Sequence, residues 1–158
     1  MGKVYGIISI KGGVGKTTTV ASLGSALANV FDKKVLVVDA NFSAPNLGLH
    51  LGIPKTEHTL HDVLLKKCQI SHAIHETDHG FDFIPSRLRG PGKIPHLDLK
   101  KHINKIKKNY DVVLIDSSPN LNNEILATMV AADQLLVVTT PDIPTLSCTM
   151  HAVKVAKR

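Results

Sequence analysis

The apolar residues of this chain gather in short runs that are separated by helical patterns. Four of the runs lead directly into polar residues, and they span Val4–Ile10, Val35–Val38, Val112–Ile115 and Leu135–Val138. The shorter run Phe81–Ile84 predicts a further strand. Apolar runs of this length are typical of strands that are buried on both faces of a parallel sheet.

Helical patterns fill the intervals between the runs. Val20, Leu23 and Leu27 follow the first run at helical spacing, and Thr59 with Asp62 three residues later indicates another helix start. The alternation predicts an α/β fold: a doubly wound, mostly parallel sheet with helices on both faces. Ligands of such folds collect at the carboxyl ends of the strands. The residues that follow the four runs are Lys11, Asp39, Asp116 and Thr139.

Composition agrees with this fold class. The chain has 158 residues, which predicts a single domain over residues 1–158, and only 4% of them are aromatic. Cys68 and Cys148 form neither a CxxC motif nor a disulfide framework, so a reducing cytoplasm is expected. No apolar run approaches the roughly 18 residues of a membrane-spanning helix, and the N-terminus lacks the shape of a signal peptide.

Positive charge is concentrated in one segment of a chain whose net charge is +6. Leu99, Ile103, Ile106 and Tyr110 fall at helical spacing there, which predicts an amphipathic helix. The same segment holds Lys100, Lys101, Lys105, Lys107 and Lys108. The simpler interpretation is a solvated helix face, and contact with anionic lipid or a DNA backbone is the alternative.

A glycine-rich loop joins the first predicted strand to the first helix. Closely spaced glycines let backbone N–H groups converge on an anion, and the helix adds the positive end of its dipole. Lys16 would reach the β- and γ-phosphates of a nucleotide, and the Thr17 hydroxyl would ligate Mg²⁺. The predicted nucleotide-binding residues are Lys11, Gly12, Gly13, Val14, Gly15, Lys16, Thr17 and Thr18.

An aspartate ends each of two apolar runs. Asp116 would hold Mg²⁺ at the sheet edge, in part through water, because this ion keeps much of its hydration shell. Asp39 could orient an attacking water, although an aspartate that caps a strand before a turn gives the same pattern. The predicted metal site consists of Thr17, Asp39 and Asp116.

These motifs resemble the MinD/ParA family of P-loop ATPases. Ile10 stands where the ordinary phosphate-loop pattern begins with glycine, and Lys-Gly-Gly-Val-Gly-Lys-Thr-Thr is the variant with a second lysine, Lys11. The segment from Asp39 through Pro-Asn-Leu-Gly resembles switch I of the MinD branch, and 111–119 resembles a Walker B strand with switch II. The switch II glycine is replaced, and Asn120 is the residue expected to substitute for it.

The resemblance implies an Mg²⁺-dependent ATPase that works as a molecular switch, with ATP and Mg²⁺ as cofactors. It makes Lys11, Lys16 and Asp39 the catalytic residues. Lys11 is expected to cross a homodimer and reach the nucleotide of the partner, and a solvated loop lysine is the alternative. Hydrolysis would then release the ATP-dependent dimer, and a regulatory or activating protein is a further expected partner.

Several functions are compatible with these motifs. The stretches Pro45–Leu49 and Thr59–Leu64 favour a MinD-like ATPase that positions the cell division site, with membrane contact only through a C-terminal segment absent here. A ParA-like partitioning ATPase on nonspecific DNA and a metal-centre assembly ATPase are the alternatives. Lys16 and the two aspartates argue against a scaffold that never hydrolyses.

The predicted last helix starts near Thr145 and runs into Arg158. The strands and the adenine-contacting asparagine that the family has after this helix are expected to be missing. The chain would then be either a fragment truncated at its C-terminus or a naturally short version.

One motif indicates a different chemistry. Residues 75–79 read His-Glu-Thr-Asp-His, the pattern of zinc proteases whose two histidines share one helix face. Gly80 and a strand-like run follow at once, and no third ligand is evident. Zinc catalysis is therefore disfavoured, and adventitious binding of Zn²⁺ or Ni²⁺ by these histidines stays open.

Overall fold

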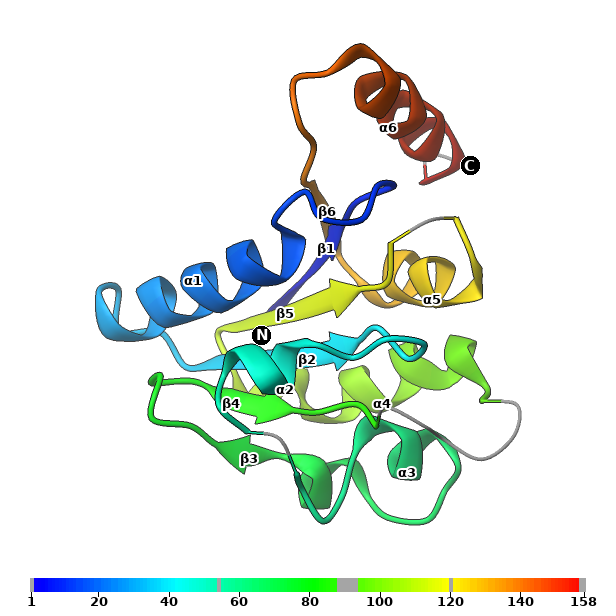
Figure 1. Ribbon diagram of the computed structural model, residues 1–158. Helices are drawn as coiled ribbons and strands as arrows, with labels where there is room; N and C mark the ends of the chain where they lie inside the picture. Colours follow the sequence, from blue (N-terminus) through cyan, green and yellow to red (C-terminus); the bar gives the residue numbers. More distant parts are fainter. Residues whose placement is uncertain (1, 54, 88–93, 120, 157–158) are drawn as a thin grey trace.

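The computed structural model describes residues 2–53, 55–87, 94–119 and 121–156. Six strands form one sheet in the order β3-β4-β2-β5-β1-β6 (Figure 1). β3 runs antiparallel to β4, and the other neighbouring strands are parallel. The strands are β1 (Lys3–Ile8), β2 (Val35–Ala40), β3 (His75–Glu76), β4 (Asp82–Ile84), β5 (Val112–Ser117) and β6 (Gln134–Val137).

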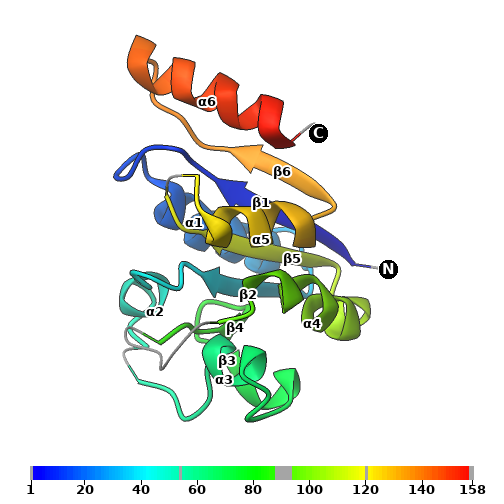
Figure 2. The same cartoon turned by 90° about the vertical axis from the view of Figure 1, so that its right-hand side faces the viewer.

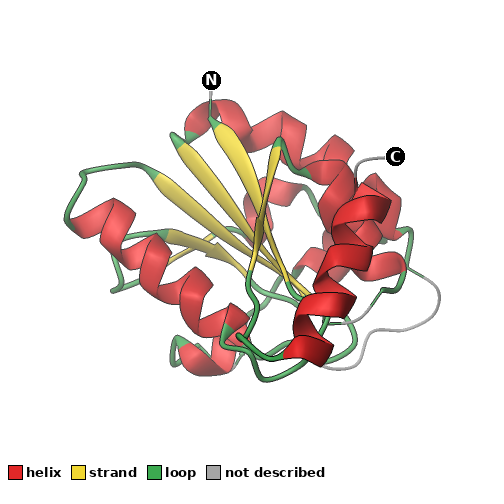
Figure 3. Ribbon diagram, turned by 90° about the horizontal axis from the view of Figure 1, so that it is seen from above, coloured by secondary structure: helices red, strands yellow, loops and turns green. Residues whose placement is uncertain are grey.

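Helices cover both faces of this sheet (Figures 2 and 3). They are α1 (Lys16–Asn29), α2 (Leu47–His50), α3 (Leu60–Leu64), α4 (Leu99–Ile106), α5 (Asn123–Ala131) and α6 (Ile143–Ala156). Short 3₁₀ helices span Ile70–Ala73, His96–Asp98 and Lys107–Asn109. α6 lies at the β6 edge of the sheet (Figure 1).

The two faces of the sheet have separate cores, which follow from the alternation of side chains along each strand. Val35 and Val37 of β2 pack with Val20 of α1. Their neighbours Leu36 and Val38 point to the other face and belong to the core of α3, α4 and α5. The central strands are thus buried on both faces, which explains their continuous apolar sequences.

The predicted doubly wound, mostly parallel fold is confirmed, and the differences lie at the ends of elements. β1 ends at Ile8, before the predicted Ile10, because the chain already turns there into the glycine loop. α6 begins at Ile143 because Asp142 accepts the backbone N–H of Thr145 at 3.0 Å. One strand, β3, was not predicted, since two residues are too few to show a pattern.

The two predicted helix features outside the glycine loop are also present. The carboxylate of Asp62 accepts the backbone N–H of Thr59 at 3.1 Å, as expected at the start of α3. α4 buries Leu99, Ile103 and Ile106 and exposes its three lysines. Of the two lysines predicted beyond them, Lys108 is exposed, whereas Lys107 is half-buried in the 3₁₀ helix after α4 and pairs with Asp133 at 3.5 Å.

The HExxH motif does not lie on a helix. His75 and Glu76 form β3, whereas His79 lies in the turn before β4. The His75 ring contacts the carbonyl oxygen of His58 at 3.1 Å, and the His79 ring contacts that of Leu51 at 3.3 Å. The two histidines therefore do not share the helix face that a zinc protease requires.

Two sequence expectations fall partly or wholly outside the described residues. The proline and glycine content of residues 86–95 predicts a loop, and only the ends of that range are described. Asn120 of the switch II segment is not described. In the described ranges, no helix combines the length and the apolar character needed to cross a membrane.

Candidate active site at the phosphate loop

The glycine loop between β1 and α1 forms an open cradle. Gly13 and Gly15 have φ values of 77° and 89°, in the left-handed region where a side chain would strain the backbone. A Cβ added to Gly12, Gly13 or Gly15 would meet no heavy atom within 4 Å. The loop borders a cavity of about 400 Å³, which Asn41, Ala44, Asn46 and His50 from the segment after β2 also line.

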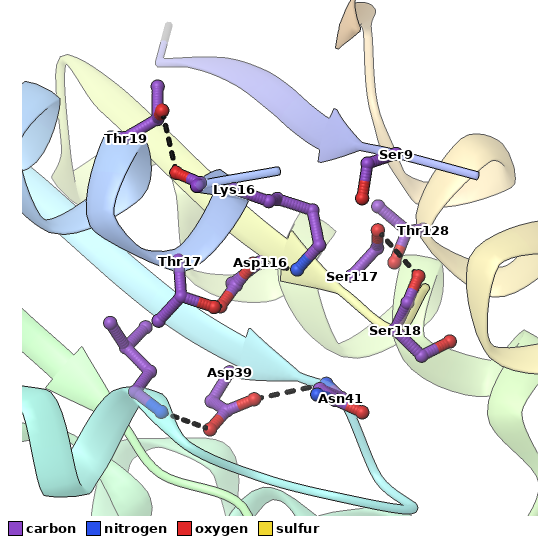
Figure 4. Close-up of polar contacts among 12 residues, drawn as sticks. Ser9, Lys16, Thr17, Thr19, Asp39, Asn41, Asp116, Ser117, Ser118 and Thr128 are labelled. Carbon is purple, nitrogen blue, oxygen red and sulfur yellow. Dashed lines mark hydrogen bonds and ion pairs between the residues drawn. The ribbon is translucent and has the colours of Figure 1, made fainter. Parts of the chain in front are cut away.

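Lys16, Thr17 and Asp116 meet beside this cradle (Figure 4). Lys16 is only 7% exposed and Asp116 only 1%. The Lys16 ammonium forms an ion pair with Oδ1 of Asp116, and the Thr17 hydroxyl donates to Oδ2 at 2.8 Å. β5 positions Asp116 and the first turn of α1 positions the other two, so the site joins segments about 100 residues apart in sequence.

Asp39 lies next to Asp116, because β2 and β5 pair these two residues in register. Its carboxylate accepts the backbone N–H groups of Asn41 at 3.0 Å and Leu47 at 3.3 Å. Burial, followed by the nearby charge of Asp116, raises the pKa of Asp39 to about 8. Below that pH this carboxyl group is therefore mostly protonated in the absence of a cation.

Lys11 lies outside this buried group. Its side chain is 58% exposed, and its ammonium is 3.8 Å from Oδ1 of Asp142. Asp142 also accepts the hydroxyl of Thr145 at 2.7 Å at the start of α6. Hydrogen bonds from Thr140 and Thr145 lower the pKa of Asp142, so it is an anion at neutral pH. The contact joins the phosphate loop to the β6–α6 connection.

The sequence did not reveal how the switch I segment is held. The hydroxyl and N–H groups of Ser43 both donate to the carboxylate of Glu124 at the start of α5. Asn122 caps α5 by accepting the N–H groups of Glu124 and Ile125 at 3.0 Å, and it also accepts the hydroxyl of Ser118. The segments after β2 and β5 are thus both attached to α5. No local motif marks Ser43 or Glu124, since they are 81 residues apart.

The residues present fit a magnesium nucleotide. The cradle offers open space in front of consecutive backbone N–H groups at a helix N-terminus, which is the arrangement that binds phosphate. Lys16 supplies a positive charge for the phosphates, and the oxygens of Thr17, Asp39 and Asp116 are ligands that Mg²⁺ prefers. The predicted nucleotide-binding and metal-binding residues are therefore brought together, whereas Lys11 lies at the rim.

Comparison with known proteins agrees with this geometry. Residues 2–154 match a family model described as an AAA domain. An uncharacterized ATP-binding protein of Methanocaldococcus jannaschii is 40% identical over 86% of this chain and 52% of its own length. A virulence plasmid ParA family protein of Chlamydia psittaci is 37% identical over 89% of this chain and 58% of its own.

A solved structure shows the same fold. The septum site-determining protein MinD of Pyrococcus horikoshii, complexed with Mg-ADP, matches 99% of this chain and 65% of its own, with a TM-score of 0.93 and 34% identity. The chain spans little more than half the length of the curated relatives named above. The phosphate loop with its second lysine, the sheet order and these matches together show that the chain belongs to the MinD/ParA family of P-loop ATPases.

Proposed function

We propose that this chain binds ATP with Mg²⁺, hydrolyses it slowly and changes between a monomer and an ATP-bound homodimer. The observation that carries the proposal is the convergence of Lys16, Thr17 and the two buried aspartates beside an open glycine cradle. The MinD relative with Mg-ADP supports the choice of ligand.

Each buried residue has a distinct proposed role. Lys16 would bind the phosphates, and Thr17 with Asp116 would hold Mg²⁺, which supplies charge stabilisation for phosphoryl transfer. Asp39 would also lie within the metal site and orient the attacking water. Its pKa of about 8 leaves it mostly protonated before loading, and a divalent cation beside Asp116 would favour the ionised form.

Lys11 is the residue proposed to act on a partner subunit. Phosphates in the cradle already have Lys16, and Lys11 is exposed and, among the described residues, forms a single solvent-accessible ion pair. Such pairs are weak, so Lys11 can leave Asp142 at little cost and reach across a dimer. Dimerisation would then depend on ATP, because the γ-phosphate is the group that a lysine from the partner would contact.

Two cellular roles are compatible with such a switch. A MinD-like role in placing the division site, in the cytoplasm and peripheral to the membrane, is our first choice because of the fold similarity to MinD. A ParA-like role on DNA is the second, because the ParA relative is 37% identical and this chain carries net charge +6. ATP-dependent binding to anionic vesicles or to duplex DNA distinguishes the two.

The decisive experiment is the solution mass, by light scattering, of the chain with Mg-ADP and with Mg-ATP. We expect a monomer with Mg-ADP and a dimer with Mg-ATP. Asp39→Ala should prolong the dimer, because ATP would be bound but not hydrolysed. Lys11→Ala should remain monomeric while still binding ATP, and Lys108→Ala, at another exposed lysine, should behave as the unmodified chain.

Other outcomes would contradict specific parts of the proposal. A monomer throughout, despite measurable ATP binding, would exclude the trans role of Lys11 in this chain. A dimer that forms equally with both nucleotides would exclude a switch that responds to the γ-phosphate. Absence of ATP binding would overturn the proposal as a whole.

A further inference from the structure

A second cavity is lined by residues of α3, of the segment that follows it and of α4. Its volume is about 920 Å³, and it shares no lining residue with the phosphate-loop cavity. Val63, Ile70 and Ile106 form its floor and belong to the core on the α4–α5 face. It is therefore a separate site on the face of the sheet opposite α1.

The ionisable lining of this cavity is mostly basic. Its basic side chains are His58, Lys66, Lys67, His72, His102 and Lys105, and no aspartate or glutamate lines the cavity among the described residues. The nearby carboxylate of Asp62 is already bound by Thr59 and by Arg87 at 2.9 Å. Asp98 is the other carboxylate whose charge acts on this region.

The positive charge is strong enough to affect a neighbouring histidine. Burial lowers the pKa of His102, and Lys105, Lys101 and Lys66 lower it further, against an opposing effect of Asp98. The lowered pKa makes His102 mainly neutral at pH 7, chiefly because the ring is buried and secondarily because of the nearby lysines. An anion in the cavity would relieve this repulsion and favour protonated His102.

Lys66, one of the lysines that line the cavity, has an unfavourable backbone conformation. Lys66 has φ of 59°, a left-handed value that glycine adopts more easily. Two backbone hydrogen bonds end α3 at this point. The N–H of Lys66 donates to the carbonyl oxygen of Val63 at 3.0 Å, and the N–H of Lys67 donates to that of Asp62 at 2.8 Å. This turn places two consecutive lysines on the cavity. A glycine would make the turn easier but would remove one of the charges.

We propose that this cavity binds a compact anion that carries several phosphate groups. The volume is that of a small-molecule site, and a singly charged carboxylate would leave two of the three lysine ammonium groups uncompensated. Phosphate oxygens accept several charge-assisted hydrogen bonds from lysine and imidazolium at once. A free polyphosphate and a phosphorylated lipid headgroup share this chemistry.

The test compares two double variants that lose equal charge. Lys66→Asn with Lys105→Gln removes two cations that line the cavity, and Asn tolerates the left-handed conformation. Lys100→Gln with Lys108→Gln is the control, since both lysines are exposed and neither lines the cavity. Inorganic tripolyphosphate is titrated calorimetrically into each chain without Mg²⁺, and histidine NMR reports on His102. The phosphate loop is intact in both variants, so any binding there is common to them.

We expect the cavity variant to lose roughly tenfold or more in tripolyphosphate affinity, and the control less than about threefold. In the unmodified chain, tripolyphosphate should raise the pKa of His102. Vesicles of phosphatidylcholine with phosphatidylinositol phosphates form a second arm, and binding there that requires Lys66 and Lys105 would identify a headgroup as the source. The proposal would be overturned if both variants lost tripolyphosphate affinity equally or if tripolyphosphate left the pKa of His102 unchanged. Binding to duplex DNA without binding to tripolyphosphate or to the vesicles would overturn it as well.

Discussion

The phosphate loop and the cavity between α3 and α4 both gather lysines, but they hold them in opposite ways. Lys16 is only 7% exposed, and its ammonium pairs with Asp116. Lys66, Lys67 and Lys105 are exposed, and in the described part of the chain none of them forms an ion pair. The loop also offers backbone N–H groups, whereas the charge of the cavity comes from side chains.

This difference predicts two kinds of anion recognition. Buried charges with fixed partners select an anion by its geometry, and salt screens them little. Exposed charges attract an anion more strongly as their number rises, and 0.1 M salt screens their attraction beyond about 10 Å. Nucleotide binding at the loop should therefore be selective and weakly salt-dependent. Anion binding in the cavity should be less selective and should weaken steeply as salt is added.

The largest expected effect comes from truncating the buried lysine. Lys16→Ala leaves the carboxylate of Asp116 buried without its ammonium, which predicts a loss of about 3–5 kcal/mol in the free energy of unfolding. It should also lower ATP affinity on the order of 100-fold, because the phosphates lose their charged partner. Urea denaturation without nucleotide and calorimetric ATP titration measure the two effects.

The matched control for that prediction is Lys105→Ala in the cavity. Its unfolding free energy should stay within about 0.5 kcal/mol of the unmodified chain, because the residue is exposed and unpaired among the described residues. Similar destabilisation by both substitutions would show that the two regions do not differ in the way described.

A smaller effect is expected from the pH dependence of Asp39. Its pKa rises from 3.8 in the unfolded chain to about 8 in the fold, mainly through burial. The stabilising contribution of the protonated form is complete below pH 3.8 and is lost as the pH rises through about 8. The nucleotide-free chain should therefore lose up to about 1.4 kcal/mol of unfolding free energy per pH unit between pH 6 and pH 8 from this group.

Asp39→Asn isolates the contribution of Asp39 to the pH dependence of the unfolding free energy, because the amide does not titrate. Thermal or urea unfolding of both chains from pH 6 to pH 9 should show a flatter profile for the variant. Parallel profiles would mean that Asp39 is ionised throughout this pH range and that burial does not raise its pKa as described.

The sequence was sufficient for the five longer strands of the sheet and for the buried half of the site. Continuous apolar runs predict buried strands, and parallel strands bring their carboxyl ends to one edge, so Asp39 and Asp116 could be placed together in advance. The glycine loop could be placed at this edge as well, because it directly follows the first of these strands and precedes a helix.

The remaining features depend on contacts between distant segments. Lys11 with Asp142, and Ser43 with Glu124, join residues whose local sequences carry no common pattern. The cavity between α3 and α4 was not predicted: helical spacing indicated the exposed lysines of α4, of which Lys105 lines the cavity, but nothing in that spacing indicated that His58 and Lys66 would line it as well. The two-residue strand β3 was missed because it is defined by its pairing with β4.

The smallest effect concerns the support of the cavity wall. The Asp62 carboxylate accepts the hydroxyl of Thr59 at 2.8 Å and its N–H at 3.1 Å. Burial acts to raise the pKa of Asp62, but these bonds and Arg87 outweigh it, so the pKa is lowered. Thr59→Ala should cost about 1 kcal/mol of unfolding free energy at pH 7, as is usual for a lost helix cap.

This cost should shrink in acid, because a lowered pKa means that the contribution of Asp62 is present above pH 3.8 and is lost as the pH falls through the folded value. Ser71→Ala, at an exposed hydroxyl beside the same cavity, is the control and should change stability by less than about 0.5 kcal/mol. Thr59→Ala leaves every cation of the cavity in place, so its tripolyphosphate affinity should fall far less than that of Lys66→Asn with Lys105→Gln. An equal fall would mean that the shape of the α3 wall, and not the number of charges, determines binding in the cavity, and the contrast with the phosphate loop would then fail.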